Sequence, residues 1–458
     1  MRKVHDRAQA LPPELHQVKL SAAGIDVGAT SHFVAVPLGR DEETVREFGA
    51  FTADLRRLAG WLEQCGVETV VMESTGVYWI PLFELLEEQG FEVKLVDPRQ
   101  LKHVPGRKSD VLDCQWLQQM HTFGLLSGAF RPTDDICVLR SYLRQRSMLV
   151  EYASHHIQHM QKALSQMNVK LQHVVEDVTG MTGMRIIRSI VAGERGPQVL
   201  AEMRDYRCKH DAATIALALE GNWREEHLFA LRQALALYDG YQEQISACDE
   251  RIETVLEQAP DRTEGQGPPL RRKGKRKQGN APRFDVHTSL YRMTGVDITR
   301  LDGFDELLSL KLISEVGTDV TPWPTEKHFT SWLGLCPGTK VSGGKVLSSR
   351  TKPCASRAAE IFRLAANSLH RSDSALGAYL RRKKAQIGKP KAVTATAHKL
   401  ARTFYALLRY GHDYVDPGQE AYERQYRERV LKNLRRRARE LGYQVVEADS
   451  LTPDLVSA

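Results

Sequence analysis

The chain of 458 residues is 42% hydrophobic, which is enough for cores in two to four domains of about 100–200 residues each. It contains no apolar run of about 18 residues and no apolar stretch near its N-terminus, so we expect neither a membrane partner nor a secretory signal. Its seven cysteines are scattered without a CxxC pair, which indicates reduced thiols in the cytoplasm and argues against a zinc ribbon.

Positive charge gathers in two stretches of the chain, although the net charge is only +7. Seven Lys and Arg residues lie between Leu270 and Arg283, and nine lie between Ser374 and Gly411, with no acid in either stretch. Such blocks favour a polyanionic partner over a solvated basic face. In the second block we expect these cations to hold nucleic-acid phosphates: Arg381, Arg382, Lys383, Lys384, Lys389 and Lys391.

Composition and apolar spacing divide the chain into consecutive segments. They are a flexible lead-in (1–20), an α/β domain (21–130), a helical region for dimerisation (131–260), a basic Pro/Gly linker or insertion (261–287), a mostly helical domain (288–415) and a charged helical tail (416–458). The Pro/Gly-rich linker is the strongest domain boundary in the sequence.

Strand-like and helical runs alternate within the α/β domain. We expect strands at 22–27, 32–38, 44–50, 67–72 and 91–96, and helices at 53–64 and 79–89. Short turns between the first three strands suggest an antiparallel meander, and the later alternation with helices suggests parallel additions. This order is the pattern of the ribonuclease H-like fold.

Four acids stand where this pattern ends its strands and opens a helix. Asp26 and Glu73 each end an apolar strand just before a turn, where a carboxylate is costly to desolvate unless something pairs with it. Asp110 and Asp113 share one face at the start of a helix that Ser109 or Asp110 caps. Each acid alone is also explained by a turn or a helix terminus, but the set predicts a Mg²⁺ site, with room for two ions, that acts on a phosphodiester.

The stretch Asp26-Val-Gly28-Ala-Thr30 also fits the phosphate loop of actin-like sugar kinases. Those proteins need a second Gly-rich phosphate loop and an adenosine site further along the chain. We find neither, so the kinase interpretation is disfavoured.

The central region predicts two long helical stretches, 134–178 and 198–258, joined by short turns into an antiparallel arm or coiled coil that dimerises. His155 and His159 are one turn apart on it, but with no third ligand apparent an exposed face is favoured over a metal site. Further on, the chain around Gly295 and 301–317 is similar to a helix-hairpin-helix, with an ordinary helix pair as the alternative.

Ser342 lies in a loop between glycines and cations. Gly343 and Gly344 allow close backbone approach, and three cations could hold a phosphate there: Lys340, Lys345 and Arg350. Ser348 and Ser349 are rival hydroxyls. Judged alone, the loop is weak evidence of a site and a plain β-turn is its default interpretation, because a serine is a weak nucleophile without activation.

Taken together, these motifs resemble those of the DEDD transposases, the recombinases of insertion sequences related to the Piv invertases, some of which are guided by a bridge RNA. The resemblance covers roughly residues 22–415. It rests on GIDVG at Asp26, MESTG at Glu73, KSDVLD at Asp110 and Asp113, and WLGLCPGTKVSGGK at Ser342.

The resemblance implies a RuvC-like N-terminal domain whose four acids bind Mg²⁺, a long coiled coil and a helical C-terminal transposase domain. It places the nucleophile in a P-x4-S-G motif, which Pro337 to Gly343 match, so this role maps to Ser342 rather than Ser348 or Ser349. It also implies dimers that pair into tetramers on donor and target DNA, a non-coding guide RNA, and a place at the bacterial or archaeal nucleoid. The degenerate hairpin motif and the basic insertion 270–283 depart from the family pattern.

We therefore expect a DNA recombinase in which Ser342 attacks a DNA phosphate and becomes covalently linked to it. The first alternative is a RuvC-like, Mg²⁺-dependent nuclease or Holliday-junction resolvase that uses water as its nucleophile. The second alternative is a non-catalytic scaffold that binds nucleic acid and whose acids are structural.

Overall fold

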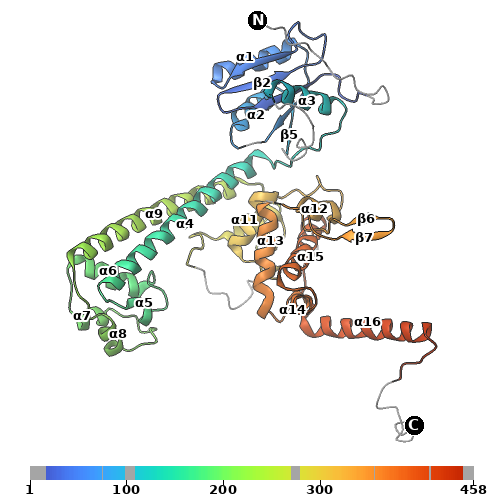
Figure 1. The fold of residues 1–458 in the computed structure, drawn as a ribbon. Coiled ribbons are helices and arrows are strands. Elements are labelled where there is room, and N and C mark those ends of the chain that lie inside the picture. Colours follow the sequence, from blue (N-terminus) through green and yellow to red (C-terminus); the bar gives the residue numbers. More distant parts are fainter. Residues whose placement is uncertain are drawn as a thin grey trace. The chain divides into compact units, whose positions relative to one another are not determined.

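The computed structural model describes residues 17–74, 76–97, 109–269, 279–354, 356–411 and 414–446. The chain forms two compact units, Met1–Arg131 and Pro132–Ala458 (Figure 1). Most of the expected lead-in and of the basic insertion lies outside the described residues. No helix within the described ranges is long and apolar enough to cross a membrane.

A five-stranded sheet forms the centre of the first unit. Its strands are β1 (Ala22–Val27), β2 (Ser31–Ala35), β3 (Val45–Gly49), β4 (Thr69–Glu73) and β5 (Glu92–Val96). They lie in the order β3-β2-β1-β4-β5. β1, β2 and β3 form an antiparallel meander, whereas β4 and β5 join β1 in parallel, which confirms the arrangement that the sequence predicts.

Helices cover both faces of this sheet. They are α1 (Thr52–Gln64), α2 (Trp79–Glu88) and α3 (Asp110–Thr122). Leu58 of α1 and Leu82 of α2 share one buried cluster with Ile25 of β1. Leu117 of α3 instead packs with Val71 of β4, whose side chain points to the opposite face. The alternation of apolar side chains along the strands therefore gives the sheet two covered faces.

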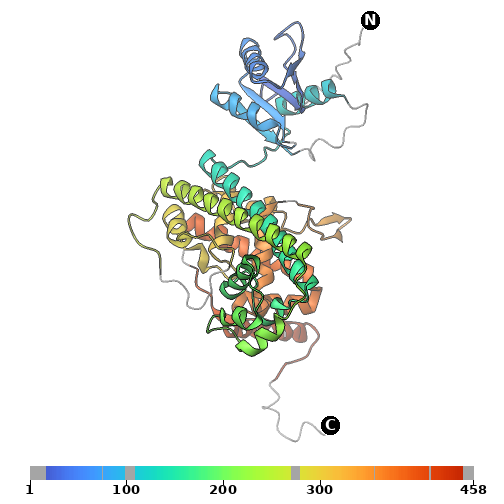
Figure 2. The same ribbon diagram turned by 90° about the vertical axis from the view of Figure 1, so that its left-hand side faces the viewer.

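The second unit begins with a pair of long helices, α4 (Asp134–Gln166) and α9 (Glu225–Gln258), which lie side by side in both views (Figures 1 and 2). Their apolar residues at helical spacing, such as Leu139 and Leu143 of α4, are buried. The expected helix at 134–178 is too long, because α4 ends at Gln166 and Asn168 adopts a left-handed conformation (φ 58°).

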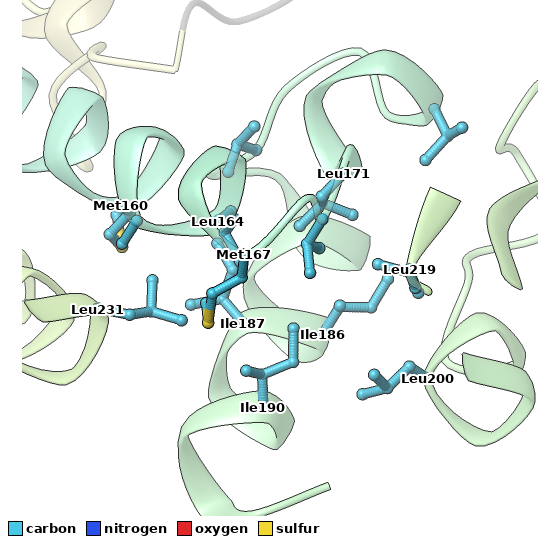
Figure 3. Close-up of a cluster of buried hydrophobic side chains, with 14 of the residues drawn as sticks. Met160, Leu164, Met167, Leu171, Ile186, Ile187, Ile190, Leu200, Leu219 and Leu231 are labelled. Carbon is cyan, nitrogen blue, oxygen red and sulfur yellow. The ribbon is translucent and has the colours of Figure 1, made fainter. Parts of the chain in front are cut away.

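The expectation that short turns join the two long helices is wrong. Residues 167–224 form a tip of short helices: α5 (Leu171–Val174), α6 (Met181–Ala192), α7 (Pro197–Glu202) and α8 (Ala212–Ala218). The tip has its own core, in which Met167, Leu171, Ile187 and Leu219 are fully buried (Figure 3). The connection is therefore a small packed body.

The rest of the second unit is mostly helical and carries one hairpin. Its elements are α10 (Val286–Thr294), η2 (Ile298–Arg300), α11 (Glu306–Val316), α12 (Glu326–Trp332), β6 (Lys340–Ser342), β7 (Lys345–Ser348), α13 (Arg357–Ser368), η3 (Leu369–Arg371), α14 (Ala375–Ile387), α15 (Lys389–Tyr410) and α16 (Gly418–Glu440). An aromatic cluster that includes Phe329, Phe362 and Phe404 forms its core. The hairpin β6–β7 projects from these helices in both views (Figures 1 and 2).

Candidate functional site

Two of the four predicted acids stand at the ends of neighbouring strands. β1 and β4 pair in parallel, with Ile25 opposite Met72, so the next residues in register are Asp26 and Glu73. Both are half-buried, whereas the residues before them on each strand are fully buried. The sheet therefore brings these two carboxylates to the same edge.

Helix α3 reaches this edge because of a glycine. A Cβ atom at Gly24 would lie 2.5 Å from the Cys114 carbonyl oxygen and 2.3 Å from the Gln118 backbone nitrogen, so only glycine lets α3 lie this close to β1. Ser109 caps α3 by accepting a hydrogen bond from the Leu112 backbone N–H (3.3 Å), which confirms that Ser109 is the N-cap. Asp110 and Asp113 lie in the first turn that follows.

The thiol of Cys114 on α3 lies near acids of both α3 and β1. Burial, with smaller contributions from the charges of Asp26 and Asp113, raises the pKa of Cys114 to about 12. Both carboxylates therefore lie close enough to Cys114 for their charges to act on its thiol. The sequence analysis missed Cys114, whose one signal is its place directly after Asp113.

Within the described residues, the four acids do not stand as ligands of one metal ion. No three His, Cys, Asp or Glu side chains in the described part of the chain stand close enough together to hold a metal ion. Asp110 is exposed, and Asp26, Glu73 and Asp113 already interact with other groups of the protein. Their carboxylate oxygens nevertheless suit a hard divalent cation, and like charges approach one another closely only when positive charge compensates them.

The predicted nucleophile lies in the second unit, on the hairpin. Ser342 ends β6 and pairs with Lys345 of β7. Gly343 (φ 54°) and Gly344 (φ 75°) occupy the two central turn positions, as a type I′ turn requires. A Cβ atom on either glycine would meet nothing within 4 Å, so their left-handed backbone, rather than close approach, is what requires glycine.

The hairpin presents Ser342 to solvent among cations. Lys340, Lys345 and Arg350 are exposed, as is Ser342 itself, whose hydroxyl makes no hydrogen bond within the described residues. The rival Ser348 is half-buried, and its hydroxyl oxygen accepts a hydrogen bond from the Arg350 backbone N–H (3.2 Å). Ser342 is therefore the more available of these two hydroxyls.

Comparison with protein families matches both halves of this arrangement. A DEDD transposase model of the IS110 type, described as Transposase, matches residues 23–169, which include all four acids. A second model, Transposase IS116/IS110/IS902 family, matches residues 297–381, which include the serine hairpin. The chain belongs to the IS110-family DEDD transposases. It is thus a DNA transposase or recombinase. A comparison with curated proteins found no match.

The basic residues that the sequence selects on α14 and α15 of the transposase divide into two groups. Arg381 donates hydrogen bonds to the Ser372 carbonyl (2.6 Å) and to Gln419 (2.6 Å), and Arg382 lies 3.3 Å over the ring of Tyr426. These two arginines attach α16 to α14 instead of being free for phosphate. Among the others Lys383 is half-buried, and the exposed cations are Lys384, Lys389 and Lys391.

The stretch of the transposase that is similar to a helix-hairpin-helix forms α10, the short helix η2 and α11. The Gly295 amide donates to the Tyr291 carbonyl (2.8 Å) and is not available to a phosphate. A Cβ atom at Gly303 would lie 2.4 Å from the Ala365 carbonyl oxygen, so this glycine serves packing against α13. On α4, His155 and His159 are exposed, as the sequence favours.

Proposed function

We propose that this transposase cuts and rejoins DNA through a covalent bond between Ser342 and a DNA phosphate, at a site that its four acids complete. The observation that carries the proposal is that one chain contains both a set of four acids and an exposed serine among cations. Asp26 and Glu73 end neighbouring strands, Asp110 and Asp113 lie in the first turn of α3, and the serine is exposed on a basic hairpin.

The strand order supports a RuvC-like, ribonuclease H-like assignment for the first unit. A meander followed by parallel additions, β3-β2-β1-β4-β5, is the arrangement expected of that fold. Asp26 and Glu73 end its central strands, and α3, which packs against β1, carries Asp110 and Asp113 in its first turn. The donor set fits Mg²⁺, which when bound would polarise the phosphate under attack.

The chemistry of the hairpin explains why it needs the acids. Attack by the Ser342 oxygen on phosphorus forms a phosphoserine ester, expels a deoxyribose hydroxyl and releases the serine proton. Residues 337–350 contain no histidine and no carboxylate that could accept this proton. Lys340 and Lys345, which flank Ser342, are suited instead to hold the phosphate oxygens. The proton acceptor therefore comes from elsewhere, and the carboxylates of a RuvC-like unit, of the same or another subunit, are suited to that role.

Further expectations concern assembly. The paired helices α4 and α9 support a coiled-coil arm that joins subunits into dimers, which pair into tetramers on donor and target DNA. Guidance by a bridge RNA and a location at the nucleoid rest on the family resemblance alone.

Trapping of a covalent adduct tests the proposal. With labelled donor and target DNA, Mg²⁺ and the guide RNA, the wild-type protein should give a protein–DNA adduct that survives denaturing electrophoresis. Ser342→Ala should give none, whereas the matched Ser348→Ala protein should still give it. An adduct with Ser342→Ala would refute the nucleophile assignment. Mg²⁺-dependent cleavage without any adduct, lost in Asp26→Asn, would favour the water-using nuclease, and the absence of any cleavage would favour the scaffold.

A further inference from the structure

Among the described residues, the hydrogen bonds and ring contacts that attach helix α16 to the rest of the transposase come from its N-terminal part. The Gln419 amide donates to the Asp373 carbonyl (2.9 Å), and Arg382 lies over the rings of Tyr422 and Tyr426. The helix has no buried residue, and it runs away from α14 and α15 (Figure 1). Its C-terminal half is thus held in place while all of its sides remain open.

Charge is arranged on one side of this free half. The stretch 429–439 contains six Lys and Arg residues and no acid. At 3.6 residues per turn, five of them share an arc of about 120°. These five, the α16 basic face, are Arg429, Lys432, Arg435, Arg436 and Arg439. All are exposed, and within the described residues one ion pair involves this face, between Arg436 and Glu440 (3.8 Å).

The basic face continues onto neighbouring helices. The pKa of Lys399 on α15 is lowered by desolvation and by the charges of Arg402, Arg429 and Lys383. Cations from α14, α15 and α16 therefore lie near one another, and Glu326 pairs with Arg402. Like charges held together on rigid elements repel, so a polyanion laid across them is stabilised by the same charges.

A second copy of α16 is not a suitable occupant. Leu431, Leu434, Ala438 and Leu441 follow heptad spacing, but over less than two heptads, whereas a coiled coil needs about three or more. Pairing would also bring two sets of arginines together. The apolar side carries no Trp or Phe to anchor it in a bilayer.

We propose that the α16 basic face is a binding site for duplex DNA, independent of sequence and of the serine chemistry. DNA is the polyanion on which a transposase acts. The major groove of B-form DNA is about 12 Å wide and admits a helix, whereas the A-form groove of duplex RNA is too narrow. From Arg429 to Glu440 the face spans about 17 Å, enough to contact phosphates along several base pairs.

A charge-neutralising variant of the full-length protein tests this site. Lys432→Gln, Arg435→Gln and Arg439→Gln together remove three charges from the centre of the face and keep residues that favour helices. Binding to a fluorescent DNA duplex of arbitrary sequence is measured by anisotropy over a range of NaCl concentrations. The triple variant should bind roughly 10- to 100-fold more weakly near physiological salt, and the slope of log K against log[salt] should fall by about 2–3.

A matched control removes equal charge elsewhere. Lys162, Arg232 and Arg251 are exposed on α4 and α9, and their replacement by Gln should leave both affinity and slope unchanged. Arg435→Lys with Arg439→Lys should also bind normally, because backbone phosphates require charge rather than the guanidinium shape. Circular dichroism verifies that helix content is kept.

Three outcomes would overturn the proposal. The first is a triple variant that binds duplex DNA like the control. The second is a loss confined to duplex or single-stranded RNA of the same sequence, and the third is a loss confined to anionic lipid vesicles. None of these readouts depends on Ser342, so failure of the α16 site and failure of the proposed chemistry are separable.

Discussion

Two glycines of the transposase serve the proposed site in different ways. Gly24 provides space, because any Cβ there would meet the backbone of α3 and move the helix that carries Asp110 and Asp113. Gly343 provides conformation, because its surroundings are open but its φ is positive. Asparagine, which tolerates the left-handed region, is therefore compatible with position 343, whereas no side chain is compatible with position 24.

The folding stability of the first unit depends on pH because of His121. Its side chain is 1% exposed and lies 2.9 Å from the Thr69 hydroxyl. Burial, together with the nearby charges of Lys19 and Lys94, lowers the pKa of His121 to about 4. An unfolded histidine titrates near pH 6.5. Above that pH the neutral side chain of His121 therefore makes its full contribution to the free energy of unfolding. This contribution is lost as the pH falls from about 6.5 to about 4, and amounts to about 3 kcal/mol.

We expect His121→Gln to flatten this dependence. Glutamine keeps a polar partner for Thr69 but does not titrate, so the loss of stability between about pH 6.5 and 4 should shrink by up to about 3 kcal/mol. The measurement is hydrogen-exchange protection of the β4 amides, compared with wild type at each pH. His210→Gln, at an exposed position, is the control. An unchanged pH profile in His121→Gln would show that other groups set it.

At the scale of elements, a buried ion pair joins the two long helices. Arg146 of α4 and Asp249 of α9 have side chains that are 4% and 5% exposed, and Nε of Arg146 lies 2.5 Å from Oδ1 of Asp249. Arg146 also donates to the Asn280 carbonyl (3.0 Å), and the Arg283 amide donates to Asp249 (3.3 Å). The pair therefore also ties down the chain that returns after the basic insertion.

Replacing one partner of the Arg146–Asp249 pair should lower the free energy of unfolding more than replacing both. Arg146→Ala leaves a buried carboxylate without its cation and should lower the free energy of unfolding by about 3–5 kcal/mol. Arg146→Met with Asp249→Leu, which fills the space with apolar groups, should recover most of that loss. Urea unfolding followed by helical circular dichroism measures the series. A double variant as unstable as Arg146→Ala would show that the hydrogen bonds to 280–283, rather than the stranded charge, dominate.

The elements also show where sequence patterns are informative. The strands of the first unit are found because buried strands are continuous apolar runs, and Asp26 and Glu73 stand out as charges at the ends of such runs. The sequence does not predict the tip at 167–224, because three of its four helices, α5, α7 and α8, have only 4, 6 and 7 residues and are too short for a clear period. The sequence predicts that Arg381 and Arg382 are free to hold phosphates. It does so because their partners, Gln419 and Tyr426, lie in α16, which composition alone presents as a charged tail.

At the scale of the whole molecule, the acids proposed for catalysis and the cations proposed for DNA binding belong to different units. The acids at the sheet edge belong to the first unit, whereas the hairpin cations and the α16 basic face belong to the second. A carboxylate site near DNA repels phosphate unless a cation compensates it, whereas a basic surface holds the backbone without a bound metal, with an affinity that falls as the salt concentration rises. Capture of DNA and chemistry on DNA are thus expected to depend on different groups.

This separation predicts opposite defects in two variants. Asp26→Asn should bind duplex DNA as tightly as wild type, or slightly more so because a negative charge is lost, yet should lose cleavage by about 100-fold or more if the acids hold Mg²⁺. Chelation of Mg²⁺ at constant ionic strength should reproduce that result in the wild-type protein. The Lys432→Gln, Arg435→Gln, Arg439→Gln protein should bind weakly, but cleave at a near-normal rate once DNA saturates it. Anisotropy and single-turnover cleavage at saturating DNA measure the two quantities. If Asp26→Asn weakens binding as much as cleavage, the acids support the structure of a DNA-binding surface, and the metal assignment fails.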